Sequence, residues 1–170
     1  DGFYYDFVLS SPITEEDFPE LEKRMKHIVK QGQKFTKENL NYDQAMHRLD
    51  EMGEPYKKEY AQELFSKNKL AELSFYQSGP FLDMCEGPHV ENTRHIPLGA
   101  FKLRSLAGAY WRGDSKNQQM TRIYAWAFES KEELELHMKQ HKEDLARDHK
   151  KLGKQLDIYH IDEDIGKGLP

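Results

Sequence analysis

Residues 100–127, AFKLRSLAGAYWRGDSKNQQMTRIYAWA, carry the clearest signal for the fold, because they hold two strand-like runs on either side of a turn. Residues 100–103 and 123–126 carry aromatic or β-branched side chains, which favour extended backbone. Between them, GDSKN at residues 113–117 has the residue types of a hairpin turn. The stretch therefore predicts two adjacent strands joined by this turn.

The flanking segments add further strands and several helices. The helices are indicated by the helical spacing of apolar side chains, with Ser130 and Glu133 as a capping box for the longest one. The expected strands are residues 2–9, 74–76, 81–84 and 158–161, and the expected helices are residues 14–32, 45–52, 55–65 and 130–151. We therefore expect an α+β fold, with a mixed, mainly antiparallel sheet flanked by helices and a long C-terminal linker helix.

The composition limits the class of protein. The chain has 170 residues, of which 37% are hydrophobic and 32% are charged, with a formal net charge of −5. No stretch is apolar enough for a membrane span or a signal peptide, and the net acidity excludes a strongly basic DNA-coating protein. The single cysteine, Cys85, cannot form an internal disulfide, which fits a reducing cytoplasm.

The densest chemical cluster is DMCEGPH, which brings Asp83, Cys85 and His89 together at the end of a predicted strand. A cysteine and a histidine four residues apart can form half of a tetrahedral zinc site, or a thiolate with a base. The alternative is a buried cysteine and a turn histidine with backbone hydrogen bonds. His137 and His141 could supply two more zinc ligands, but amphipathic packing of their helix explains them as well.

Other side chains are candidates for binding. Lys57 lies near the start of a predicted helix and could hold a phosphate or polarise a water molecule. Tyr5 lies on a predicted strand and could stack on a base. Arg104 and Arg112 belong to a basic run interleaved with aromatic residues, which is a candidate RNA-facing surface. The alternative is an ordinary sheet with one polar face.

Three segments together resemble the editing domain of threonyl-tRNA synthetase, a domain shared with the alanyl-tRNA synthetase editing family. They are GFYYD at residues 2–6, DMCEGPHV at 83–90 and AGAYWRGDS at 107–115. RDHKKLG at 147–153 and GKGLP at 166–170 resemble the connection to the catalytic domain and its entry. The resemblance implies an editing domain at 1–129 without its N-terminal part, a linker helix at 130–153 and a lead-in at 154–170.

The resemblance also implies a function. Editing domains of this family hydrolyse mischarged seryl-tRNA(Thr) by water attack on the aminoacyl ester, while the parent enzyme ligates threonine to tRNA with ATP. The implied partners are the 3′ end of tRNA(Thr) carrying serine and the catalytic domain, in a cytoplasmic parent enzyme that is a homodimer. The expected catalytic residues are Lys57, Asp83, Cys85 and His89, and the expected substrate-binding residues are Tyr5, Arg104 and Arg112.

One departure from the family pattern bears on activity and on metal. The family pairs its CxxxH element with an HxxxH element upstream of GFYYDF, and this sequence begins at Asp1, just before that segment. We therefore expect the chain alone to be weakly active or inactive. We also expect Cys85 and His89 to supply only two zinc ligands, and ATP and zinc to belong to the catalytic domain. The alternative hypotheses are a small zinc-binding module and an RNA-binding module, both without catalysis.

Overall fold

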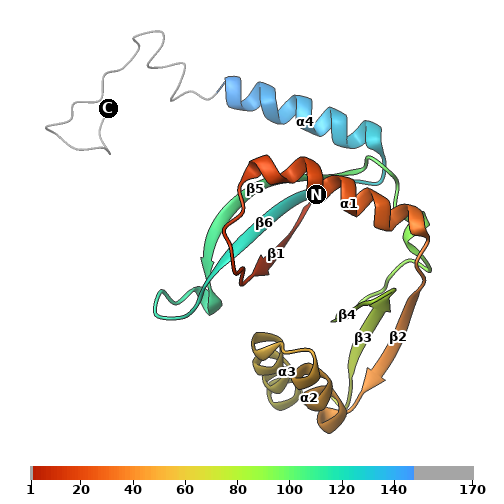
Figure 1. Cartoon of the computed structure of the whole chain (residues 1–170), viewed down its shortest axis with the longest axis vertical. Helices are drawn as coiled ribbons and strands as arrows, with labels where there is room; N and C mark the ends of the chain where they lie inside the picture. The colour runs from red at the N-terminus through yellow and green to blue at the C-terminus, as the bar shows by residue number, and fades with distance from the viewer. Residues whose placement is uncertain (1, 148–170) are drawn as a thin grey trace, which may run out of the picture. The chain divides into compact units, whose positions relative to one another are not determined.

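The computed structural model describes residues 2–147 and confirms the α+β class, with helices and two small antiparallel sheets (Figure 1). The chain divides into two compact units. Of the described residues, one unit holds 2–12 and 99–147, and the other unit is Ile13–Leu98. The expected single sheet is thus two three-stranded sheets, one in each unit.

The first unit contains the predicted hairpin. Its sheet has the order β1-β6-β5, formed by β1 (Gly2–Phe7), β6 (Gln119–Ala127) and β5 (Phe101–Tyr110), and all of its pairs are antiparallel. The turn after β5 begins with the short η3 helix (Trp111–Gly113). It is then closed by a hydrogen bond of 2.9 Å from the Asn117 N–H to the Asp114 carbonyl. This unit confirms the strand pair that residues 100–127 predict.

The helix α4 (Lys131–Ala146) follows β6 in the same unit. The Ser130 hydroxyl accepts a hydrogen bond from the Glu133 N–H at 3.2 Å, so the predicted capping residue does begin this helix. Leu134 on its first turn is buried. The expected extension of the linker helix to residue 151, the expected strand at 158–161 and the lead-in at 154–170 lie outside the described residues.

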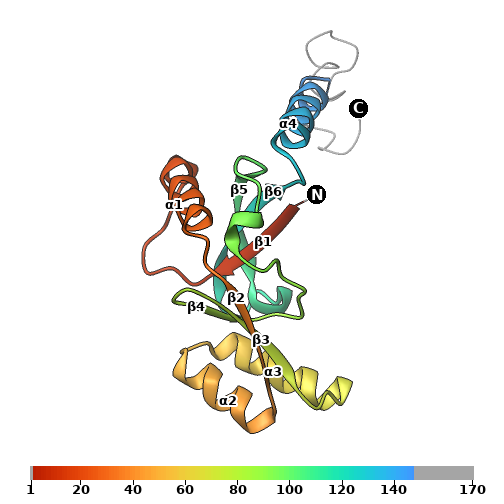
Figure 2. The same cartoon turned by 90° about the vertical axis from the view of Figure 1, so that its right-hand side faces the viewer.

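The second unit has a three-stranded sheet of order β2-β3-β4 and three α-helices. In chain order its elements are η1 (Glu15–Asp17), α1 (Phe18–Gln31), β2 (Phe35–Leu40), α2 (Tyr42–Glu51), α3 (Pro55–Asn68), β3 (Leu73–Ser78), β4 (Phe81–Met84) and η2 (Thr93–His95). The helices α2 and α3 lie side by side next to this sheet (Figures 1 and 2).

The core of the second unit follows from the alternation of side chains along its strands. Phe75 on β3 is fully buried together with Leu49 on α2 and Ala61 on α3. Leu40 and Leu73, which are partners in the β2–β3 register, belong to the same cluster. One face of the sheet is therefore packed against the helices, and the residues between these positions point to the other face.

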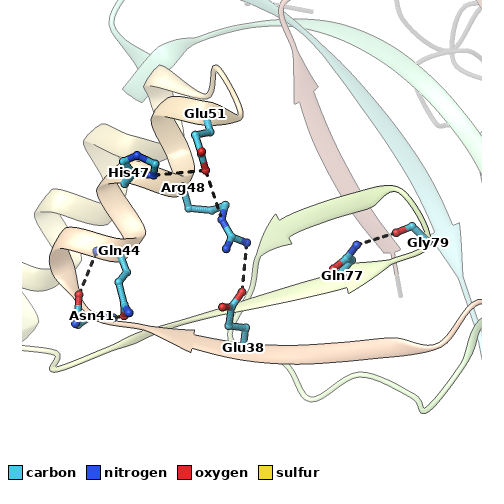
Figure 3. Close-up of polar contacts among 8 residues, drawn as sticks. All are labelled: Glu38, Asn41, Gln44, His47, Arg48, Glu51, Gln77 and Gly79. Carbon is cyan, nitrogen blue, oxygen red and sulfur yellow. Dashed lines mark hydrogen bonds and ion pairs between the residues drawn. The ribbon is translucent and has the colours of Figure 1, made fainter.

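Exposed polar contacts also connect α2 with β2 (Figure 3). Asn41 and Gln44 form a reciprocal capping box, in which each side chain accepts from the other residue's backbone N–H at 3.1 Å. Arg48 donates to Glu38 on β2 at 3.2 Å. The carboxylate of Glu51 lies 3.9 Å from the Arg48 guanidinium. Because these groups are largely exposed, their contribution to stability is small, and the buried cluster sets the position of the helix.

The end of α1 is closed by a residue far along the chain. Gly32 follows the helix with a φ of 67°, in the left-handed region. The buried Thr93 hydroxyl lies 3.0 Å from the Val29 carbonyl, to which it donates, and accepts from the Gln33 N–H at 3.0 Å. This side chain satisfies backbone groups that a helix end leaves without partners.

The strand β2 was not expected from the sequence. Its residues FTKENL are polar at four of the six positions and lie at the edge of the sheet, so they show no apolar alternation.

In the described part of the chain, no helix combines the length and apolar character that a bilayer crossing requires.

Candidate functional site

An ion pair joins two of the predicted site residues. Asp83 lies on the edge strand β4, and Lys57 lies in the first turn of α3. The Lys57 Nζ is 2.8 Å from Asp83 Oδ1, and the two side chains are only 24% and 15% exposed. Asp83 Oδ1 also accepts from the Met84 N–H at 2.7 Å, and Glu54 lies 3.6 Å from Lys57 Nζ. The structure therefore gathers a cation and two carboxylates where β4 meets the start of α3.

Cys85 and His89 follow β4 in one loop. The Cys85 N–H donates to the Ser74 carbonyl at 3.0 Å, and the Ser74 hydroxyl donates to the Cys85 carbonyl at 2.5 Å. The thiol is exposed, and its sulfur accepts from the Gly87 N–H at 3.4 Å. The Gly87–Pro88 peptide bond is cis. The expected alternative of a buried cysteine is wrong, because the loop presents the thiol to solvent.

The His89 ring contacts two aromatic side chains of the same sheet. Its ring centroid lies 3.9 Å from that of Tyr76, with 29° between the ring planes. Phe35 at the start of β2 lies 5.1 Å away at 43°. Neither residue was predicted from the sequence. The available signal was the alternation along β3, which places Tyr76 on the face opposite the buried Phe75.

The strand register explains why these groups share a face. Tyr76 is the partner of Asp83 in the β3–β4 pair and of Lys37 in the β2–β3 pair. Side chains of directly paired residues lie on the same side of a sheet. This side is opposite to the one that carries Phe75 and Met84 against the helices. The second unit therefore presents a polar and aromatic face next to the CxxxH loop.

The remaining predicted residues, Tyr5, Arg104 and Arg112, belong to the first unit. Tyr5 on β1 is 36% exposed and stacks on Phe7 at 4.9 Å. Arg104 lies at an irregularity in the β5–β6 register, with its guanidinium 5.5 Å from the Trp126 ring centroid. Arg112 has a φ of 56° and lies 5.5 Å from the ring centroid of Trp111.

The first unit contains an ion pair between Arg122 and Asp6 that was not predicted from the sequence. Arg122 donates two hydrogen bonds of 2.7 Å to the two carboxylate oxygens of Asp6, its partner in the β1–β6 register. Its guanidinium lies 4.0 Å from the Tyr4 ring centroid. The hydrogen bond with Asp6, and then the one with Tyr124, raises the pKa of Arg122 above its usual value. The charge of Arg122 is thus matched within the sheet.

Among the described residues, the histidines of α4 form no metal site. His137 and His141 lie with parallel rings 6.3 Å apart, and both contact Trp126 edge to face. Packing of α4 on the sheet thus accounts for these two residues. In neither unit of the described chain do three His, Cys, Asp or Glu side chains gather as a metal site. Cys85 and His89 supply two donors, fewer than the four of a structural zinc site.

Comparison with known families gives a match over part of the chain. Residues 73–124 match the family described as the threonyl and alanyl tRNA synthetase second additional domain. The match includes Asp83, Cys85 and His89, together with Arg104 and Arg112.

Comparison with individual proteins extends over almost the whole chain. The chain is 44% identical over 169 residues to a threonine–tRNA ligase of Exiguobacterium sp., which covers 99% of the chain and 25% of that protein. Threonine–tRNA ligases of Borrelia garinii and Gloeobacter violaceus are 44% and 45% identical over the same length, with 28% and 26% of each protein covered. The chain therefore spans about a quarter of the length of these relatives.

Proposed function

The chain is homologous to one segment of the threonine–tRNA ligases, and from this relationship we propose that it forms an editing site that hydrolyses seryl-tRNA(Thr). The observation that carries the proposal is the contact of Lys57 with Asp83 beside the loop of Cys85 and His89. These four side chains supply a cation, a carboxylate, a thiol and an imidazole in one unit of the fold.

The need for such a site has a physical basis. Serine lacks only the methyl group of threonine, and a missing methylene changes the binding free energy by roughly 1–3 kcal/mol. A synthetic site for threonine therefore admits some serine, and a second site that admits serine and excludes threonine removes the wrong product. The substrate proposed here is the serine ester at the 3′ end of tRNA(Thr).

The reaction adds water across this ester. A water oxygen bonds to the carbonyl carbon, the bond from that carbon to the ribose oxygen breaks, and the ribose oxygen takes a proton. In our proposal Asp83 pairs with the seryl ammonium or accepts a hydrogen bond from the seryl hydroxyl. Lys57 holds the terminal ribose or the attacking water. Cys85 and His89 contact the water or the ester directly, with no covalent intermediate on the thiol.

Substrate approach and assembly belong to the same proposal. Tyr5, Arg104 and Arg112 contact the RNA near its 3′ end, through stacking and phosphate charge. The partners are tRNA(Thr) and the catalytic domain of a cytoplasmic, homodimeric threonine–tRNA ligase, which ligates threonine with ATP. We assign no step of the proposed hydrolysis to zinc.

The test is deacylation of seryl-tRNA(Thr), with threonyl-tRNA(Thr) as the control substrate. It uses the chain itself and a version extended upstream by the segment that carries the family's HxxxH element. We expect selective hydrolysis of the seryl ester by the extended protein and a lower rate from the chain alone. Rates from the chain alone that equal those of the extended protein would contradict the expected weakness.

Matched variants connect this activity to the site. Lys57→Ala and Asp83→Ala should each reduce the rate at least tenfold, whereas Lys58→Ala, on the next residue of α3, should leave it unchanged. Binding of tRNA that survives Asp83→Ala and Lys57→Ala, without any selective hydrolysis, would instead favour an RNA-binding module. In that case binding should depend on Arg104 and Arg112.

A further inference from the structure

We propose that Tyr76 is a positioning residue for His89, which holds the imidazole in one plane at the editing site. The proposal rests on the hydrolytic function proposed above. Tyr76 lies on the central strand β3, between its partners Lys37 on β2 and Asp83 on β4. It is therefore anchored in the sheet, whereas His89 lies in a loop after β4.

The contact between the two rings has the geometry of a stack. The centroids are 3.9 Å apart with 29° between the planes, so one face of the imidazole rests on the phenol ring. Phe35, at 5.1 Å and 43°, contacts the same imidazole. A partial rotation of the His89 ring about its Cβ–Cγ bond would break the stack. The plane of the imidazole is therefore set by Tyr76.

Backbone hydrogen bonds hold the loop on both sides of His89. Before it, the Cys85 N–H donates to the Ser74 carbonyl at 3.0 Å. After it, the Phe35 N–H donates to the Glu91 carbonyl at 3.0 Å, and Lys34 bridges Asn92. The loop is thus tied to β3 at one end and to β2 at the other, which keeps His89 over the two aromatic rings.

The turn before His89 is shaped to admit the tyrosine. Gly87 has a φ of 74°, and a Cβ atom at this position would collide with the Tyr76 hydroxyl. The phenol therefore reaches across the turn into space that only a glycine leaves open. Lys37 Nζ lies 5.9 Å from the Tyr76 ring centroid. Contacts with Lys37, Gly87 and His89 together define the position of the tyrosine.

This arrangement has a chemical consequence for ester hydrolysis. His89 is exposed, although Tyr76 covers one face of its ring. A proton acceptor or donor must be aligned with the attacking water or the leaving oxygen, and a misplacement of about 1 Å can reduce a rate about 100-fold. Loss of the stack should therefore reduce the rate of the chemical step more than it changes substrate binding.

The first experiment tests the contact between the Tyr76 and His89 rings and requires no measurement of activity. The His89 ring protons are observed by NMR in the full chain labelled with ¹³C-histidine, and assigned with His89→Gln. We expect them upfield of ordinary histidine signals, because they lie over the Tyr76 ring. Tyr76→Phe should keep this shift, and Tyr76→Ala should remove it. Tyr60→Ala, a substitution of an exposed tyrosine on α3 of the same unit, is the matched control and should change nothing.

The second experiment tests the positioning role in the extended protein that hydrolyses seryl-tRNA(Thr). Tyr76→Ala should lower kcat about 10- to 100-fold with KM changed less than threefold. Tyr76→Phe should stay within threefold of the unsubstituted protein in both constants. If Tyr76→Ala does not fold, as judged by circular dichroism, Tyr76→Leu replaces it, since leucine fills the space without an aromatic ring.

The outcomes are separable. A His89 spectrum that is unchanged in Tyr76→Ala refutes the stack, whatever the hydrolysis shows. A lost shift with unchanged kcat refutes the positioning role but leaves the editing function intact. Absence of selective hydrolysis in the unsubstituted extended protein refutes the proposed function, and the catalytic role of Tyr76 with it, while the spectrum still decides whether the rings are stacked.

Discussion

The ion pair between Lys57 and Asp83 is predicted to couple the two residues by about 1–2 kcal/mol in the free energy of unfolding. At 2.8 Å the attraction between two unit charges is about 6 kcal/mol at an effective dielectric constant of about 20. Both side chains are less than a third exposed, so desolvation offsets most of this attraction. The coupling that remains, about 1–2 kcal/mol, exceeds the roughly 0.2–1 kcal/mol that is typical of exposed ion pairs.

The perturbation is a double-mutant cycle with Lys57→Met, Asp83→Asn and the double variant. Lys57→Met should be the more destabilising single substitution, because it removes the cation at 2.8 Å from an Asp83 carboxylate that is only 15% exposed. Asp83→Asn leaves Lys57 beside Glu54, which lies 3.6 Å from its Nζ. The double variant should be destabilised by less than the sum of the two single effects.

The assay is urea unfolding of the four proteins, followed by circular dichroism. The control is the same cycle on Lys58 and Asp50, whose atoms are 2.6 Å apart but whose side chains are 31% and 59% exposed. This cycle should give a coupling below about 1 kcal/mol. Effects of Lys57→Met and Asp83→Asn that add within about 0.5 kcal/mol would show that the two side chains are not coupled, because independent sites behave in this way.

Three further predictions concern the second unit. Phe75→Ala should lower the free energy of unfolding by about 3–5 kcal/mol in urea titrations, because Phe75 is fully buried, whereas Phe81→Ala at a 59% exposed position should cost less than about 1 kcal/mol. Thr93→Val should destabilise the chain by about 1–3 kcal/mol, since it removes the hydroxyl that serves the end of α1; an unchanged thermal midpoint would contradict this. The hydrogen bond from Arg24 lowers the pKa of Glu20 below its ordinary value of 4.5. The stability that the ionised Glu20 carboxylate contributes should therefore be present above pH 4.5 and lost as the pH falls through the folded-state pKa. The difference in unfolding free energy between the unsubstituted chain and Glu20→Gln should accordingly shrink in acid and not at neutral pH.

Local structure was predictable wherever the signal is local. The hairpin of β5 and β6 follows from two strand-like runs and a polar turn, and the start of α4 follows from the capping residue Ser130. The helix α1 ends at Gly32 as its sequence indicates. The strand β2 escaped prediction because a polar edge strand lacks the alternation that marks a half-buried strand. The number of sheets was also not predicted, since strand pairing depends on residues far apart in the chain.

The candidate site was likewise predictable only where its signal is local. Asp83, Cys85 and His89 were identified from their spacing in one short segment, and the resemblance of that segment to a known family pointed to editing. The contact of Asp83 with Lys57 requires the start of α3 to meet the edge strand β4, and no local pattern encodes that meeting. The stack of Tyr76 on His89 depends equally on the register of β3 against β4.

The class of fold, the residues that can do chemistry and the family that they resemble can be read from the amino-acid sequence, because side-chain type, spacing and periodicity are local properties. Which of these residues meet depends on the folded arrangement of the chain. Burial of Phe75 against α2 and α3 fixes the orientation of β3, and this orientation places Tyr76 on the opposite face, beneath His89. A one-residue shift in strand register would exchange the two faces, so packing of the core also sets the geometry of the site.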